Sequence, residues 1–228
     1  MSSRVGPFSR GLMAAGAAAW ILASGAMGAQ AMTFRLEAMR LGGPCGAQCP
    51  QVIVADGQIS NSTPDEFLQF LRENAARHDL RTVVFLNSDG GYVVASMELG
   101  QIFRRIGAAT VVARLSPSRG SSRFMTAHCL SACVYAFMGG VKRVAPPGSV
   151  LGIHRMFANQ AQSHGIWGDG PTERVYDNGS MAGMLANYSA RMGVSRELIH
   201  YAEHISSQKI HVVTPAELTR WGLASRGF

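Results

Sequence analysis

Apolar and polar positions form blocks along the chain that predict strands and helices in alternation. Short apolar runs at 51–59, 81–88 and 109–114 predict strands. The run at 81–88 has an unbroken apolar centre, which favours burial on both faces of a parallel sheet. The segment 92–106 is apolar at helical spacing and ends at Gly107, a residue type that commonly terminates helices. Strands that alternate with helices predict an α/β domain.

The segment after Asn61 predicts a helix that begins close to Thr63. Thr63 is a residue type favoured at the N-cap, and Pro64 suits the first helical position because its missing N–H needs no partner there. Glu66 lies three residues after Thr63, which is the spacing of a capping box. The apolar positions of this predicted helix are Phe67, Leu68, Phe70 and Leu71.

The rest of the chain has a weaker pattern, without an internal repeat or a sign of a second domain. The segments 115–127 and 156–170 have no clear period and are predicted as loops. We expect further strands at 33–40 and 150–154, and further helices at 172–192 and 195–205. All of these elements fall within one predicted α/β domain, residues 32–228.

The N-terminal segment has the features of a secretory signal. Arg4 and Arg10 precede an apolar, Ala/Gly-rich run at 11–28, and Ala29-Gln-Ala31 has the small-x-small pattern of a signal-peptidase site. We therefore expect residues 1–31 to be a signal peptide, and the mature protein to be periplasmic or secreted. An uncleaved membrane anchor is the alternative, although the run is short and rich in glycine for that role.

The charge of the chain is modest and dispersed. The 228 residues carry a net charge of +7, and cleavage after Ala31 would remove Arg4 and Arg10 but no acid, which leaves 7 − 2 = +5. The basic residues are scattered rather than clustered with aromatic side chains, so we expect no nucleic-acid partner. We likewise expect no membrane association once the signal is removed.

Four cysteines lie in two Cys-x3-Cys pairs, Cys45 with Cys49 and Cys129 with Cys133. In an exported protein such cysteines usually form disulfides, and local pairing within each motif is the first expectation. The second disulfide would then bracket Ser131 and stiffen the turn that carries it. Cross-pairing between the motifs is the main alternative, and a four-cysteine zinc site is a further one.

Three segments combine residues that are suited to nucleophilic catalysis. Ser131 lies between small residues at the start of an apolar, helix-like run, and His154 ends the next predicted strand. A serine hydroxyl becomes an effective nucleophile when a neighbouring base removes its proton. Gly90 and Gly91 follow the strand at 81–88, where bare backbone N–H groups can face a developing oxyanion. Structural roles for the serine, in helix packing, and for the histidine, in the core, are the alternatives.

In their order along the chain, these segments resemble the proteolytic subunit of Clp protease and its relatives in the Clp/crotonase superfamily. In that family a strand ends in Asn-Ser-Pro-Gly-Gly, a nucleophilic serine begins a helix, and a histidine follows a Lys-Arg turn and a strand. This chain has Asn-Ser-Asp-Gly-Gly at 87–91, then Ser131, Lys142-Arg143 and His154, and residues 214–223 resemble the closing helix of the family. The resemblance covers about residues 50–224 and implies an exported member with a Clp/crotonase-like spiral of parallel-sheet ββα units.

The resemblance also implies roles for individual residues. Ser131 would be the nucleophile and His154 the general base, and the N–H groups of Ala132 and of Gly90 or Gly91 would form the oxyanion hole. The family orients its histidine with an aspartate from a later helical region, but no aspartate follows Asp177 here. Glu203 has the nearest matching position. The alternatives are Asp169, Asp177, a hydroxyl such as that of Ser206, or no third residue at all.

The function implied is that of a serine peptidase acting on peptides or unfolded protein segments. We expect no cofactor and no metal. We also expect no ATP-driven partner, because an ATP-dependent motor is not expected outside the cytoplasm. Self-association into a homo-oligomer is plausible, since relatives commonly form rings or trimers. The main alternative is a binding or scaffold protein that kept the fold but lost efficient catalysis.

Two other enzyme classes match short patterns in the sequence. His200-Tyr-Ala-Glu-His204 has the spacing of a zinc-peptidase helix, for which Glu217 would be the remaining candidate ligand. A Ser/Lys dyad would instead use Lys142 or Lys209 as the base of Ser131.

Overall fold

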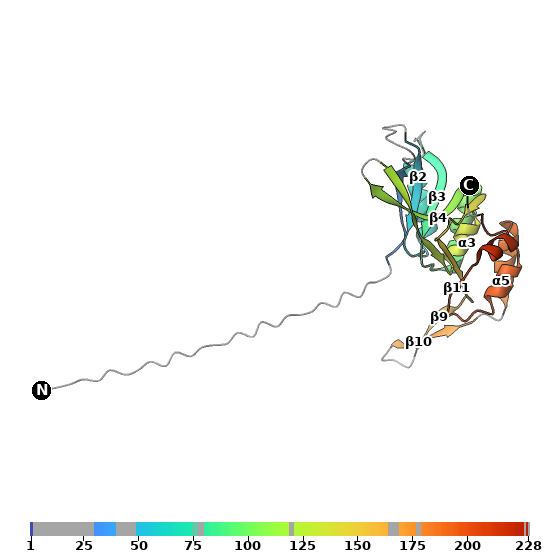
Figure 1. The fold of residues 1–228 in the computed structure, drawn as a ribbon. Coiled ribbons are helices and arrows are strands. Elements are labelled where there is room, and N and C mark those ends of the chain that lie inside the picture. The colour runs from blue at the N-terminus through green and yellow to red at the C-terminus, as the bar shows by residue number, and fades with distance from the viewer. Residues whose placement is uncertain are drawn as a thin grey trace.

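The structure, a computed structural model, describes residues 1, 30–39, 49–74, 76, 80–118, 121–163, 169–176, 179–225 and 227 (Figure 1). Most of the predicted signal peptide, residues 2–29, and the cysteine at position 45 lie outside these ranges. None of the helices in the described ranges is both long and apolar enough to cross a membrane.

The largest sheet has a parallel centre, as the buried apolar runs predicted. Its order is β1-β2-β3-β4-β5, and β7 also pairs with β4. The pairs β2–β3, β3–β4 and β4–β7 are parallel, whereas β1 and β5 are antiparallel to their neighbours. The strands are β1 (Thr33–Ala38), β2 (Gln51–Asp56), β3 (Leu80–Asn87), β4 (Ala109–Ser118), β5 (Ser121–Thr126) and β7 (Lys142–Val144).

Two smaller sheets complete the β-structure. One has the order β11-β8-β6, with β6 (His128–Leu130) parallel to β8 (Val150–Ile153) and β11 (His211–Val212) antiparallel to it. The other is an antiparallel hairpin of β9 (Ala158–Ser163) and β10 (Asp169–Val175), which projects from the rest of the molecule in Figure 1. An isolated parallel bridge from Ser88 to Cys129 joins the end of β3 to β6.

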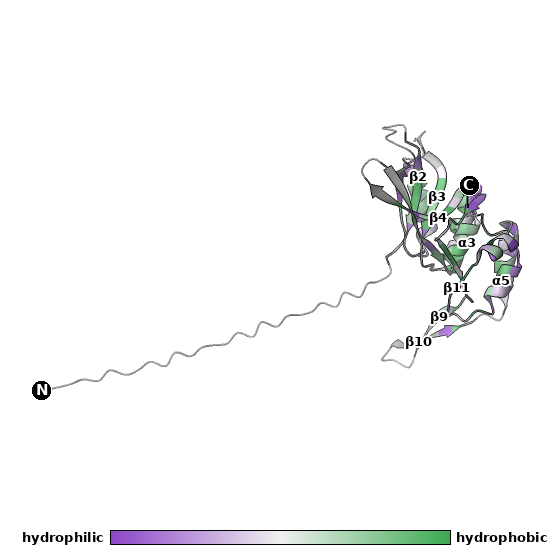
Figure 2. Ribbon diagram, in the orientation of Figure 1, coloured by the Kyte–Doolittle hydropathy of each residue, from purple (hydrophilic) through white to green (hydrophobic). Residues whose placement is uncertain are grey.

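Six helices lie within the described ranges, and α3 is the most buried of them. They are α1 (Thr63–Glu73), α2 (Val93–Arg105), α3 (Cys133–Met138), α4 (Ser180–Arg191), α5 (Glu197–Ala202) and α6 (Pro215–Arg220). Every residue of α3 is buried, and Figure 2 shows its ribbon in the colours of a hydrophobic segment. In the view of Figure 1, α3 stands between the strands of the large sheet and α5. Ser131 lies two residues before this buried helix, and its backbone is therefore anchored to the core.

The large sheet is buried on both faces, because its strands alternate between two apolar clusters. In β2, Ile53 belongs to the cluster shared with the helices, whereas Val52 and Val54 belong to a smaller cluster on the opposite face. Phe85 of β3 joins the smaller cluster and stacks on Phe124 of β5, with ring centroids 5.6 Å apart. The alternation of period two follows from the strand geometry and explains the continuous apolar runs in the sequence.

The structure corrects three predictions of secondary structure. The predicted loop at 115–127 continues β4 and forms β5, so that the two strands make an antiparallel hairpin. The segment predicted as irregular at 156–170 contributes β9 and the start of β10, and the helix predicted from 172 begins only at Ser180. In both hairpins, polar segments that are adjacent in the sequence pair through backbone hydrogen bonds. The residue composition of these segments does not indicate such bonds.

The start of α1 also differs from the prediction. The helix begins at Thr63 with Ser62 as its N-cap, and no side chain caps it. The Thr63 hydroxyl instead accepts a hydrogen bond from the N–H of Ser60, and Ser62 Oγ donates to Glu66. A complete capping box is present at α6, where Thr214 and Glu217 satisfy each other's backbone N–H groups.

Candidate functional site

Ser131 occupies an unusual backbone conformation between β6 and α3. Its φ is +54°, and it is the only non-glycine residue with a positive φ in the described part of the chain. Its N–H donates to the carbonyl of Gly152 in β8, at 2.8 Å, and its carbonyl accepts from the N–H of Val134, at 3.1 Å. The left-handed conformation is costly for a residue with a side chain, so it is expected where the surrounding structure imposes it.

The glycine turn after β3 packs directly against the Ser131 turn. A Cβ atom at Gly90 would lie 2.8 Å from the carbonyl oxygen of Leu130 and 2.9 Å from the Cβ of Ser131. Gly90 and Gly91 have φ values of +108° and +143°, which favour glycine. The two turns therefore pack so closely that there is no space for a side chain at position 90.

The candidate oxyanion donors are not equivalent. The N–H of Gly90 donates to Ser88 Oγ at 3.1 Å, which engages this group within the turn. The N–H groups of Gly91 and Ala132 make no hydrogen bond with any described residue. Of the two glycines proposed from the sequence, Gly91 thus has the available N–H, and Ala132 has a second one beside Ser131.

His154 follows β8 and is almost fully buried, with 6% of its surface exposed. Its Nδ1 lies 2.7 Å from the carbonyl oxygen of Arg155. A carbonyl can only accept, so Nδ1 carries the proton and Nε2 carries the lone pair. Burial lowers the pKa of His154 below 6.5, the Arg155 carbonyl opposes this shift, and the charge of Arg174 lowers the pKa further. The ring is therefore neutral at pH 7 and in the tautomer that a general base at Nε2 requires.

Glu203 does not contact His154. It follows α5 as the C-cap residue, and its Oε2 lies 3.2 Å from the Nε of Arg155, an ion pair whose N–H is not aligned for a hydrogen bond. The guanidinium of Arg155 also lies over the ring of Tyr176, 4.6 Å from its centroid. The backbone carbonyl of Arg155 thus takes the place at Nδ1 where the resemblance led us to expect a carboxylate. Among the alternative third residues, Ser206 accepts at Oγ a hydrogen bond from the N–H of Gln208. The side chain of Asp169 and the whole of position 177 lie outside what the structure describes.

Ser131, His154 and Gly91 line the same cavity, which has a volume of about 860 Å³. Its walls include the apolar side chains of Tyr92, Val93, Val94, Leu130, Met156, Phe157, Val175, Met181 and Ile210. Tyr92, Val94, Val175 and Ile210 are exposed at its edge. Of the described residues, neither Lys142 nor Lys209 lines this cavity, so the Ser/Lys alternative has no base at the serine.

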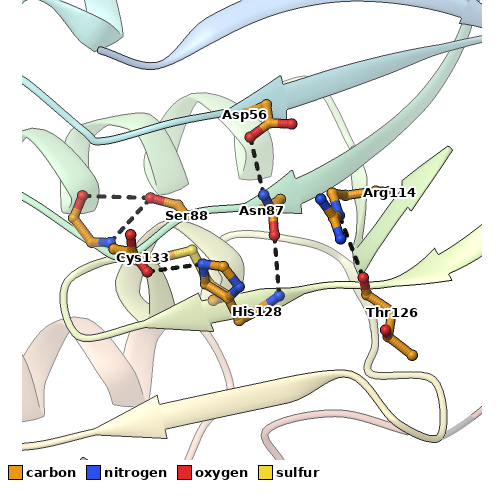
Figure 3. Close-up of polar contacts among 10 residues, drawn as sticks. Asp56, Asn87, Ser88, Arg114, Thr126, His128 and Cys133 are labelled. Carbon is orange, nitrogen blue, oxygen red and sulfur yellow. Dashed lines mark hydrogen bonds and ion pairs between the residues drawn. A yellow bond between two sulfur atoms is a disulfide. The ribbon is translucent and has the colours of Figure 1, made fainter. Parts of the chain in front are cut away.

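A second, polar cavity of about 410 Å³ adjoins the first, since Gln58 and Asp89 line both. A hydrogen-bonded series crosses its wall: Asn87 donates from Nδ2 to Asp56, at 3.0 Å, and accepts at Oδ1 from the backbone N–H of His128, at 3.2 Å (Figure 3). His128 Nε2 also lies 2.8 Å from Asp89 Oδ1. No sequence pattern indicated a role for His128. The series ties the ends of β2, β3 and β6 together and so fixes the spacing between the glycine turn and the Ser131 turn.

The structure pairs Cys129 with Cys133 in a disulfide that spans Ser131, which is the local pairing expected from the spacing. Cys49 is also disulfide-bonded, and its expected partner, position 45, lies outside the described residues. These bonds leave no thiolates for a four-cysteine zinc site within the described ranges, where no cysteine is free.

The zinc-peptidase pattern at 200–204 does not assemble a metal site. No group of three potential ligands comes together among the described residues. Glu203 pairs with Arg155, and the proposed third ligand, Glu217, binds His211 and Thr214. The histidines at 200 and 204 lie one turn apart, and the Nδ1 of His204 contacts the carbonyl of His200.

Comparison with known proteins identifies the fold. No family model matches the chain, and no curated protein matches its sequence. Two solved structures of the 1510-N membrane-bound stomatin-specific protease match 76% of this chain: a serine-to-alanine mutant (18% identity, 78% of that chain, TM-score 0.50) and a lysine-to-alanine mutant in complex with a substrate peptide (19% identity, 74% of that chain, TM-score 0.51). The ClpP1 structure from Listeria monocytogenes matches with 16% identity over 76% of this chain and 88% of that one, at a TM-score of 0.47. The chain has a mixed α/β fold with parallel sheets, which it shares with the two structures of the stomatin-specific protease.

Proposed function

We propose that this chain is an exported serine peptidase that hydrolyses peptides or unfolded protein segments without an ATP-driven motor. The observation that carries the proposal is the pairing of two features in one cavity. Ser131 is held in a left-handed turn, the N–H groups of Gly91 and Ala132 have no acceptor among the described residues, and His154 is neutral with no described partner at Nε2. The fold, which this chain shares with solved structures of proteases, supports the same function.

In the proposed reaction, Nε2 of His154 takes the proton of Ser131 Oγ while the oxygen attacks the substrate carbonyl carbon. The carbonyl oxygen becomes an oxyanion that accepts hydrogen bonds from the N–H groups of Gly91 and Ala132. The peptide C–N bond breaks as His154 returns the proton to the leaving amine. Water then attacks the acyl-enzyme by the same route in reverse, and releases the acid product and the free serine.

The Arg155 carbonyl performs part of the work of a triad carboxylate. It selects the correct tautomer of His154 and fixes the orientation of the ring. It cannot offer the full negative charge that stabilises an imidazolium in a Ser-His-Asp triad. We therefore propose a catalyst of moderate turnover, for which the apolar cavity walls select extended segments with apolar side chains.

A fluorophosphonate probe tests the proposal, because it reacts with activated serines. We expect covalent labelling of Ser131 in the parent protein, identified by peptide mass, and loss of labelling in Ser131→Ala and in His154→Ala. Ser62→Ala, at an exposed serine before α1, should be labelled as fast as the parent. Equal labelling of the His154→Ala variant would exclude the histidine as the base, and absence of labelling in the folded parent would exclude the peptidase.

The second candidate is a peptide-binding protein on the same fold. The contact of His154 with a backbone carbonyl, in place of a carboxylate, is the observation that favours it. Such a protein would bind an extended apolar peptide in the 860 Å³ cavity and leave it intact. Turnover that is equal in the parent and in Ser131→Ala, together with peptide binding by both, would establish this function instead.

A further inference from the structure

Ser131 is bracketed by the two cysteines of the Cys129–Cys133 disulfide. We propose that this disulfide is a positioning element that holds the serine in its left-handed conformation, so that only the oxidised protein presents an active nucleophile. The inference rests on the proposed function, because it assigns a redox dependence to the same site. It is supported by the backbone of the turn, by the anchors of the two cysteines, and by their burial.

The conformation of Ser131 needs an external restraint. A left-handed backbone conformation is unfavourable for a residue with a side chain, because its Cβ crowds the following carbonyl oxygen. Such residues persist where the surrounding structure determines their conformation from several sides. The φ of +54° at Ser131 is therefore a state that the free turn would leave if its ends could move.

The disulfide fixes both ends of that turn. Cys129 is the central residue of β6, opposite Leu151 of β8, and Cys133 is the first residue of α3. Three residues separate them, and their Cα atoms lie 5.2 Å apart. The other described restraints include the two backbone hydrogen bonds of Ser131, the bonds from the Leu130 N–H to Ser88 and from the Tyr135 N–H to Ala132, and the contact with Gly90. The disulfide is the only covalent link across the turn other than the chain itself.

Reduction would disturb this geometry directly. A dithiol such as dithiothreitol breaks the S–S bond, each cysteine sulfur gains a hydrogen, and the reductant is oxidised to its cyclic disulfide. Two thiols in van der Waals contact need more space than two bonded sulfurs. Both cysteines are fully buried, so that space has to come from separation of β6 and α3. Ser131 can then relax from the left-handed conformation, and its hydroxyl loses alignment with Nε2 of His154.

The experiment compares the oxidised full chain with the same protein after dithiothreitol, with alkylation and peptide mass reporting which cysteines are reduced. We expect the rate constant of fluorophosphonate labelling to fall at least tenfold as Cys129 and Cys133 become alkylated, and to recover on re-oxidation of an unalkylated sample. For a peptide substrate, kcat should fall while KM changes less than about twofold, because other elements form most of the cavity wall.

Two double variants provide matched controls. Cys129→Ala with Cys133→Ala should show the slow labelling rate with or without dithiothreitol. Cys45→Ser with Cys49→Ser should keep the parent rate and the full response to the reductant. Thermal unfolding of each sample distinguishes a displaced turn from an unfolded protein, because displacement of one turn leaves a cooperative transition.

Hydrogen exchange makes the outcome independent of activity. Reduction should raise amide exchange across 129–138 while exchange within β2 and β3 stays constant. Unchanged exchange and unchanged labelling in a protein with Cys129 and Cys133 reduced would overturn the positioning role. If the oxidised parent is never labelled, the proposed peptidase fails, and faster exchange at 129–138 on reduction would still establish the restraint on the turn.

Discussion

At the scale of single residues, His154 has the tautomer that the proposed base requires, without a neighbouring carboxylate. The proton on Nδ1 of His154 is held by the carbonyl of Arg155, 2.7 Å away, and burial keeps the ring neutral. Backbone carbonyls are available at every position, so no residue type in the sequence indicates this contact. Glu203, the carboxylate that the resemblance suggested for this role, forms an ion pair with the side chain of Arg155 and does not contact His154.

The lowered pKa of His154 predicts the acid side of the pH–rate profile. The proposed peptidase reaction requires the neutral ring, so its rate should fall only as pH drops below 6.5, through the lowered pKa. Arg174 adds to the lowering, so Arg174→Gln should move the midpoint of the pH–rate profile upward, because removal of a nearby positive charge favours the protonated ring. Arg72→Gln on α1, with the same change of charge, should leave the midpoint in place.

The same shift predicts the direction of the stability change. The unfolded chain binds a proton at His154 near pH 6.5, whereas the folded chain binds it only at lower pH. Folding stability contributed by this group is therefore complete above pH 6.5 and decreases as pH falls toward the folded pKa. For the pH–rate profile of the preceding prediction, a midpoint that moves to lower pH in Arg174→Gln would contradict the effect assigned to the charge of Arg174.

At the scale of elements, the site depends on the contact between two turns. The glycine turn after β3 and the serine turn before α3 are joined by the bridge from Ser88 to Cys129 and by Asn87. Gly90 has no space for a side chain, because its Cβ would approach the Leu130 oxygen to 2.8 Å. The close approach accounts for Gly90, whereas the backbone of Ile59 leaves no space for a side chain at Gly91.

We therefore predict that Gly90→Ala removes labelling of Ser131 and lowers the free energy of unfolding by at least about 2 kcal/mol, from backbone strain and steric overlap. Gly107→Ala is the matched control, because Gly107 has a φ of +66° and nothing within 4 Å of its Cβ position. It should cost about 1 kcal/mol and retain labelling. Thermal unfolding and probe labelling measure both effects, and equal behaviour of the two variants would refute the steric explanation.

At the scale of the whole molecule, Arg143 connects segments that are distant in the sequence. Its guanidinium donates to backbone carbonyls after α3, α4 and α6, and no carboxylate contacts it among the described residues. Burial and the nearby charge of Arg104 lower its pKa. The acceptors are Met138, Gly140, Met192, Gly222 and Leu223. The basic residue that formed part of the family resemblance thus has a structural role here.

Arg143→Lys should lower the free energy of unfolding by about 2–3 kcal/mol, because one ammonium group cannot replace a planar fork that serves several carbonyls. Arg105→Lys, at the exposed end of α2, should change it by under about 0.5 kcal/mol. Chemical denaturation of the two variants tests this difference. Equal midpoints would show that solvent satisfies these carbonyls when the arginine is absent.

The sequence by itself determined the parallel centre of the large sheet, because strands buried on both faces must be apolar at every position. It also located Ser131, His154 and the glycine pair, since each lies at the boundary of a predicted element. The extension of β4 beyond residue 114, β5 and the hairpin β9–β10 escaped prediction, because these polar segments resemble loops until they pair.

Only the tertiary structure decided which of these residues share a cavity and which groups serve them. The choice of Gly91 over Gly90 as a donor depends on a hydrogen bond to Ser88, and the contact of His154 depends on a carbonyl that every residue possesses. The bond from His128 to Asn87 joins residues 41 positions apart. Such contacts are made by groups common to many sequences, and only the folded chain brings them within hydrogen-bonding distance.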